Sequence, residues 1–151
     1  MELTADRGYL DLLQNISDTY TQGRIQAVQA VNTHITQTYW QVGRQIVEFE
    51  QGGKARAEYG RARISKLAAD LSVRHGKGFS RTNLISMRLL YLRYPISQTL
   101  SDLLGWSHWV ELLKIDDPLE RSFYEQQTLC ERWSVRELIL REAVARGEGL
   151  L

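Results

Sequence analysis

The 151-residue sequence contains very little cysteine, which limits the chemistry open to it. Cys130 is its single cysteine, and this excludes an intramolecular disulfide and any CxxC metal or redox motif. Phe123, Leu129 and Trp133 lie close to it in the sequence. We therefore expect Cys130 to be a buried, inert thiol.

Long apolar runs are also missing. No stretch approaches the roughly 18 apolar residues that a membrane-spanning helix requires. The N-terminal sequence MELTADRGYLDLL carries acidic residues where a secretory signal peptide carries basic ones. These absences predict a cytoplasmic protein that makes no membrane contact.

Proline is scarce as well, with only Pro95 and Pro118, and this scarcity predicts helices throughout the chain. Hydrophobic residues make up 43% and charged residues 25% of the sequence, the balance of a folded soluble protein. We predict an all-α fold in a single helical domain, residues 1–151. Its segments are N-terminal helices at 6–53, a basic helix-turn-helix at 54–95, and an acidic, tryptophan-rich helical segment at 96–147.

The central stretch from Arg61 to Tyr94 reads as two helices joined by a tight turn. Ile64, Leu67, Ala68 and Leu71 have the spacing of one buried helix face. Gly76 is suited to end that helix, and Ser80 is suited to cap the next one, which should begin at Arg81 and stop before Pro95. A helix, a short glycine-bearing turn and a second helix form the helix-turn-helix pattern.

The same stretch is strongly basic. From Lys54 to Arg93 there are ten basic residues and two acidic ones, Glu58 and Asp70, which gives a local charge of +8. The whole chain carries +1, so the remaining residues carry −7. A phosphate backbone would respond to the local charge, and this favours contact with nucleic acid over a merely solvated helix face.

In helix-turn-helix proteins the start of the second helix meets base edges and the flanking elements hold phosphates. Leu84, Met87 and Tyr91 share an apolar face that should turn inward. We expect base contacts from Ser80, Arg81, Thr82, Asn83 and Ser86. We expect phosphate contacts from Lys54, Arg56, Arg61, Arg63 and Lys77.

The N-terminal segment predicts two helices. The first covers residues 6–16, has Tyr9, Leu12, Leu13 and Ile16 as its apolar stripe, and suggests no function. The second runs from about residue 20 to 51 and shows a heptad pattern, which indicates either packing on the chain's own helices or a homodimer. The residues of that expected dimer interface are Ile25, Val28, Asn32, Ile35, Tyr39, Val42, Ile46 and Phe49.

The flanking segments contain local signals for helix ends. Between the long helix and the helix-turn-helix lies a basic connection, in which we expect a break at Tyr59 and Gly60. Beyond Pro95, capping signals at Ser107, Asp117 and Ser134 predict three further helices. Their tryptophans and other large apolar residues are best explained as a hydrophobic core.

Five sequence blocks occur together in the order found in one known family. They are the YW-VG-IVE pattern of residues 39–48, ISKLAADL of 64–71, GFS-NL-MR-LY of 78–91, LGWSHWVELLKIDDPLERSFY of 104–124 and WSVREL of 133–138. On these blocks, and over roughly residues 15–140, the chain resembles the N-terminal domain of the YhcG-like PDDEXK nuclease family, a former domain of unknown function. The resemblance implies a helical domain that binds DNA, followed in the family by a restriction-endonuclease-like domain with metal-binding acids and a lysine.

We expect this chain to lack that nuclease half, because the likeness ends after Leu138. We identify no catalytic residue, metal site or cofactor. The acidic pair at Asp116 and Asp117 reads as a helix cap, and His108 with Glu111 offers only two metal ligands on one helix. Nucleophile-elbow and Walker motifs do not occur.

Two functional hypotheses follow from the sequence. The first is a DNA-binding domain that resembles the targeting half of a nuclease. The second is a helical dimerisation or assembly module that docks a separate nuclease subunit or another protein. The basic stretch favours the first hypothesis, and the heptad pattern favours the second.

Overall fold

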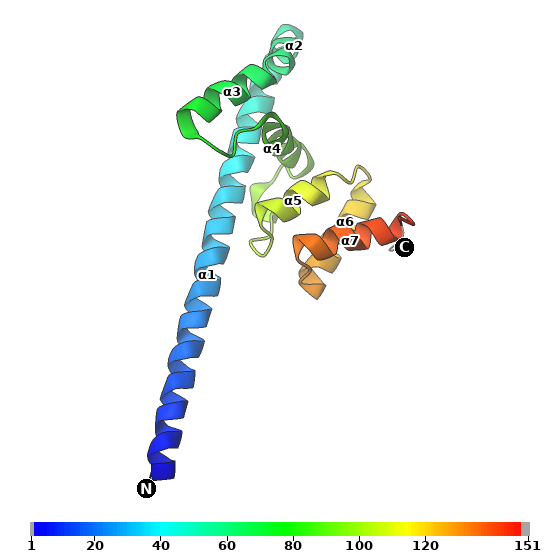
Figure 1. Cartoon of the computed structure of the whole chain (residues 1–151). Helices are drawn as coiled ribbons and strands as arrows, with labels where there is room; N and C mark the ends of the chain where they lie inside the picture. Colours follow the sequence, from blue (N-terminus) through cyan, green and yellow to red (C-terminus); the bar gives the residue numbers. More distant parts are fainter. Residues whose placement is uncertain (1, 149–151) are drawn as a thin grey trace.

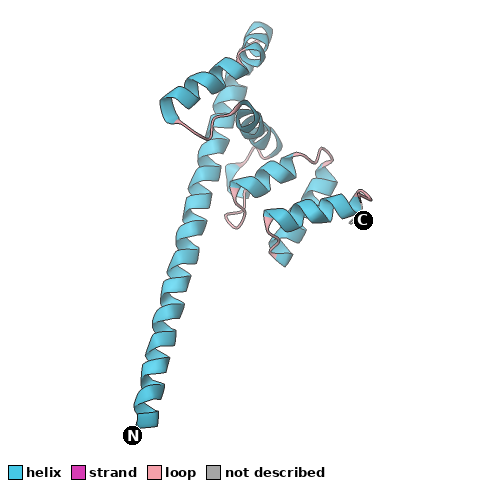
Figure 2. Cartoon of the chain, in the orientation of Figure 1, coloured by secondary structure: helices cyan, strands magenta, loops and turns pink. Residues whose placement is uncertain are grey.

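The computed structural model describes residues 2–148, and within this range every regular element is a helix (Figure 2). The all-α prediction is therefore confirmed. In chain order the elements are α1 (Glu2–Glu50), α2 (Lys54–Ala62), α3 (Ile64–His75), α4 (Arg81–Arg93), the 3₁₀ turn η1 (Ser97–Thr99), α5 (Trp106–Leu113), α6 (Pro118–Glu131) and α7 (Val135–Ala145). None of the described helices combines the length and apolar character needed to cross a membrane.

Helix α1 is 49 residues long and continuous, so the prediction of one long N-terminal helix is confirmed. The expected break near residues 17–19 is wrong. The Gln14 side chain donates a hydrogen bond to Asp18 (2.9 Å), and the Thr19 hydroxyl donates to the Asn15 carbonyl (2.9 Å). These contacts between residues four apart satisfy polar side chains inside the helix, so the helix continues without a cap.

The N-terminal half of α1 forms an arm that projects away from the other helices (Figure 1). All residues from Asp6 to Val28 are exposed, and from Asp6 onward the first deeply buried side chain is that of Thr36. At 1.5 Å per residue the exposed part is about 35 Å long. The remaining helices gather around the C-terminal part of α1 (Figure 1).

The main hydrophobic core joins α1 and α4 to the C-terminal helices. Trp40, Leu90, Trp109, Leu112 and Leu138 are all buried in it, which confirms the prediction that the tryptophan-rich segment supplies a core. The Trp40 indole N–H donates to the Tyr94 carbonyl (2.7 Å), so α1 also binds the end of α4. This bond holds the chain at the point where it leaves α4 before Pro95.

Helices α1 and α4 cross in close contact at Gly43. A Cβ atom built on Gly43 would lie 2.0 Å from the Met87 carbonyl oxygen, well inside van der Waals contact. Met87 is itself fully buried. Only glycine allows the two backbones to approach this closely.

Three local predictions are wrong. The expected break at Tyr59 and Gly60 is absent, because α2 continues through both residues and the chain turns at Arg63 instead. Helix α5 begins at Trp106, with Gly105 as its N-cap, and not after Ser107. Cys130 is exposed, because the surface of α6 that carries it faces away from the core.

Candidate nucleic-acid interface

Helix α3 ends, and α4 begins and ends, where the sequence predicted. Gly76 ends α3 with a positive φ of 81°, a conformation that favours glycine. The Ser80 hydroxyl accepts a hydrogen bond from the Asn83 backbone N–H (3.1 Å) and caps α4, which starts at Arg81. A five-residue turn therefore connects α3 to α4 and presents the first turn of α4 to solvent.

Exposed cations lie on α2 and on the turn between α3 and α4. Arg61 is in the last turn of α2, and Lys77 and Arg81 flank the N-terminus of α4. The Arg56 guanidinium stacks over the Phe49 ring at 4.4 Å, which anchors α2 to the end of α1. Helix α2 and the turn lie at opposite ends of α3, and both are beside the C-terminal part of α1 (Figure 1), so the cations are spread along this part of the molecule. Lys54 and Arg63 are exposed there too.

Asn83 lies where the sequence placed it, but its side chain is already engaged. Its amide nitrogen donates to the Gly78 carbonyl (3.0 Å), and its amide oxygen accepts from the Trp106 indole N–H (3.2 Å). Trp106 in turn packs edge-on against Tyr39, with ring centroids 4.8 Å apart. Asn83 therefore ties the turn to α5, and both ends of its amide are bonded within the chain.

Ser86, the other expected base contact on this helix, is buried, with 8% exposed. The predicted inward face of α4 is confirmed, since Leu84 and Met87 are fully buried and Tyr91 packs against the main core. Arg88 forms a salt bridge with Glu50 at 2.8 Å, so part of the local positive charge is neutralised within the chain. Ser80, Arg81 and Thr82 remain exposed at the start of α4.

The heptad stripe of α1 divides into two parts in the structure. Tyr39, Val42 and Ile46 pack on a small cluster formed by Ala68, Leu84 and Met87, so these three positions belong to the chain's own core. Asn32 is half-buried beside Gly105, and Phe49 is covered in part by Arg56. The stripe stays largely exposed at Ile25, Val28 and Ile35.

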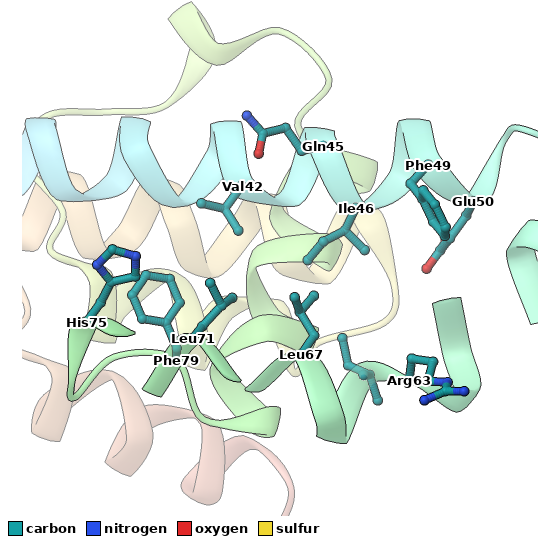
Figure 3. Close-up of a pocket in the computed structure, with 11 residues that line it drawn as sticks. Val42, Gln45, Ile46, Phe49, Glu50, Arg63, Leu67, Leu71, His75 and Phe79 are labelled. Atoms are coloured by element: carbon teal, nitrogen blue, oxygen red, sulfur yellow. The ribbon is translucent and has the colours of Figure 1, made fainter. Parts of the chain in front are cut away.

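A pocket of about 520 Å³ separates α3 from the C-terminal part of α1 (Figure 3). It explains why the predicted buried face of α3 is only partly covered, since Ala68 is buried while Leu67 is 37% exposed. Most of its wall is apolar, and charged or titratable side chains lie at its ends. The lining residues are Val42, Gln45, Ile46, Phe49, Glu50, Arg63, Ile64, Leu67, Leu71, His75 and Phe79.

Helices α5 and α7 bring together two buried carboxyl groups that the sequence did not reveal. Glu111 and Glu142 are 9% and 3% exposed. Burial, followed by the hydrogen bond and the negative charge of Glu111, together raise the pKa of Glu142 to about 7. The Lys114 ammonium forms a salt bridge with Glu111 at 2.9 Å. Spacing in the sequence gave no signal, because the pairing depends on how α5 packs against α7.

No group of three or more His, Cys, Asp or Glu side chains among residues 2–148 is placed to hold a metal ion. His108 contacts the Trp133 carbonyl through Nε2 (2.9 Å) and accepts from the Gly105 backbone N–H through Nδ1 (3.3 Å). Asp117 caps α6 as predicted, through a bond from the Leu119 backbone N–H (3.3 Å). The candidates considered from sequence thus serve helix ends and contacts between helices.

Comparison with known proteins assigns the chain to a family. The chain belongs to the family described as the DUF1016 N-terminal domain, which matches residues 15–144. It is similar to a protein of Escherichia coli (strain K12) named "Putative nuclease YhcG", with 38% identity over 163 aligned residues. These cover 87% of this chain and 44% of that protein, so the chain spans less than half of its relative's length. No solved structure matches the chain significantly. The resemblance inferred from the five sequence blocks is confirmed.

Proposed function

We propose that this chain is a DNA-binding helical domain and that it serves as the targeting part of a YhcG-like nuclease system. The observation that carries this proposal is the presence of exposed cations on α2 and the α3–α4 turn, beside the C-terminal part of α1. These cations lie within a stretch of net charge +8, while the rest of the chain is acidic. A local excess of this size attracts a phosphate backbone whatever the overall charge.

The exposed side chains divide into two roles. Arg81 and Thr82, at the exposed start of α4, would meet base edges, with Ser80 beside them as the cap. An arginine at this position can bond guanine O6 and N7. Phosphate contacts would come from Lys54, Arg56, Arg61, Arg63 and Lys77, which lie on α2, at the start of α3 and in the α3–α4 turn.

A salt titration tests this proposal. We expect the chain to bind a 30-base-pair duplex of random sequence in fluorescence anisotropy, with affinity falling steeply between about 50 and 200 mM salt. Arg61→Ala should weaken binding to all duplexes and flatten the salt slope by about one unit. Arg136→Ala removes an exposed cation from α7, outside the basic stretch, and should change neither quantity. Absence of binding at 50 mM salt would contradict the proposal.

The second candidate function is that of an assembly module, and the arm of α1 is the observation that favours it. Tyr9, Leu13, Ile16 and Tyr20 are between 49% and 66% exposed on one helix. Such a continuous apolar surface on a soluble chain indicates a partner. The two functions are compatible, because the arm is the N-terminal part of α1, whereas the exposed cations lie on α2 and the α3–α4 turn.

A further inference from the structure

The apolar residues of the arm follow a strict heptad register. Tyr9, Leu13, Ile16 and Tyr20 alternate in steps of four and three, and the same alternation continues through three small residues, Gly23, Ala27 and Ala30. Large residues thus occupy the N-terminal half of this seam, and small ones occupy its C-terminal half. The seam expected from the sequence begins at Ile25, on a helix that was expected to start near residue 20. The seam described here uses other residues and begins at Tyr9. It can do so because α1 continues through residues 17–19, where an interruption was expected.

The seam lies on the side of α1 that faces away from the rest of the chain. At about 100° per residue it is centred about 180° around the helix from Thr36 and Val47, which are buried against the body of the molecule. The space beside it is open, since a Cβ built on Gly23 would meet no atom within 4 Å. A partner helix can therefore run along the seam without touching the body.

The charges of the arm restrict what the partner can be. Asp11 and Asp18 lie on the face opposite the seam, and the arm from residue 6 to 30 holds only two basic residues, Arg7 and Arg24. A nucleic acid would need cations beside the seam, and a membrane-surface helix would need them on the polar face. The arm provides neither, so its chemistry fits another neutral, apolar helix.

We propose that the partner is a second copy of this chain and that the two arms pair antiparallel. When Tyr20 of one copy is set against Gly23 of the other, three of the four large seam residues meet a small one, and the fourth, Tyr9, meets His34 at the end of the overlap. Ile16 then faces Ala27, and Leu13 faces Ala30. Layers that combine a large and a small side chain fill the space between two helices evenly. Parallel pairing would instead stack Tyr20 on Tyr20 and Gly23 on Gly23, which leaves crowded and empty layers.

The residues that flank the seam suit the same register. Leu10 comes opposite Val31 of the second copy, and both are more than half exposed in the single chain. Ser17 comes opposite Arg24, so no like charges meet. The overlap covers about 26 residues, or almost four heptads, a length typical of stable coiled coils. Val28 and Ile25 lie outside this contact.

Two matched substitutions test the surface. Ile16 and Val28 are 58% and 59% exposed on the same helix, but only Ile16 lies on the seam. Sedimentation of the full chain at about 50 μM should show a dimer. Ile16→Glu should weaken self-association at least tenfold without loss of helicity by circular dichroism, and Val28→Glu should leave the dimer intact. A monomeric parent chain, or equal effects of the two changes, would overturn the proposal.

Disulfide formation tests the direction of pairing. On a Cys130→Ser background, a chain with Ile16→Cys is mixed with a chain with Ala27→Cys under mild oxidation. Antiparallel arms should give the mixed disulfide and little of either homodisulfide. Homodisulfides in each separate sample, with no preference for the mixed product, would show parallel pairing and overturn the register. Neither test uses DNA, so self-association and DNA binding can each fail independently.

Discussion

The backbones of Gly43 and Met87 touch where α1 crosses α4, and no side chain fits between them. Gly43→Ala should therefore force the two helices apart and destabilise the chain by about 1–3 kcal/mol or more. Gly8→Ala is the matched control, because a Cβ at Gly8 meets nothing within 4 Å. Urea denaturation of both variants measures the difference, and equal stabilities would show that the crossing adjusts at little cost.

Asn83→Ala should lower the free energy of unfolding and should leave the preference among DNA sequences unchanged. The change leaves the Trp106 indole N–H and the Gly78 carbonyl without their partner, which costs about 1–3 kcal/mol when groups are partly buried. Thr82→Ala, at an exposed neighbouring position, should leave the unfolding midpoint nearly unchanged. A stable Asn83→Ala variant that loses affinity for one DNA sequence alone would restore Asn83 as a base contact.

Stability should fall as the pH rises from about 5 to 8. The pKa of Glu142 is raised to about 7 in the folded chain, while the unfolded chain has the ordinary value near 4.5. The folded state therefore binds the proton on Glu142 more tightly than the unfolded state does. The contribution of this proton to the free energy of unfolding is complete below pH 4.5 and is lost as the pH rises through 7.

Thermal unfolding at a series of pH values measures this effect. Glu142→Gln should flatten the pH dependence relative to the parent chain and should raise the melting temperature at pH 8. Glu131→Gln changes an exposed carboxylate on α6 and should preserve the parent profile. If the melting temperatures of Glu142→Gln and of the parent chain changed with pH in parallel, the pair formed by Glu111 and Glu142 would not hold the proton.

The purified chain should not cut plasmid DNA in the presence of Mg²⁺ or Mn²⁺. The chain spans 44% of its nuclease relative, and none of its described acidic residues forms a cluster suited to a metal. Agarose gel analysis of supercoiled plasmid measures cleavage. Metal-dependent cutting that a single substitution in this chain abolishes would contradict the expectation.

Features set by neighbouring residues were predictable from the sequence. Ser80, Asp117 and Ser134 cap helices as expected, because the side chain of each cap bonds to a backbone N–H two or three residues away. Gly76 ends α3 for an equally local reason, its positive φ. The same locality explains why the turn between α3 and α4 was placed correctly.

Features that depend on distant residues were not predictable in this way. The polar side chains of Asn83 and Ser86 suggested an exposed surface, but α5 and α1 cover them, and Trp106 is 23 residues from Asn83. Arg88 was counted as a free cation, while its partner Glu50 lies at the end of α1. A heptad pattern likewise predicts that a seam is covered without showing which helix covers it.

In the proposed dimer, the length of α1 would also set the distance between the two ends that we propose to bind DNA. In the antiparallel pair, the two crossing points at Gly43 would lie about 65 Å apart along the arms. This distance corresponds to about 19 base pairs, or nearly two turns of duplex DNA. A dimer should therefore bind a duplex of about 30 base pairs with both ends and a duplex of about 12 base pairs with only one end. The length of the arm would then set the spacing between the two bound DNA segments, and inserting one heptad into the arm would lengthen that spacing.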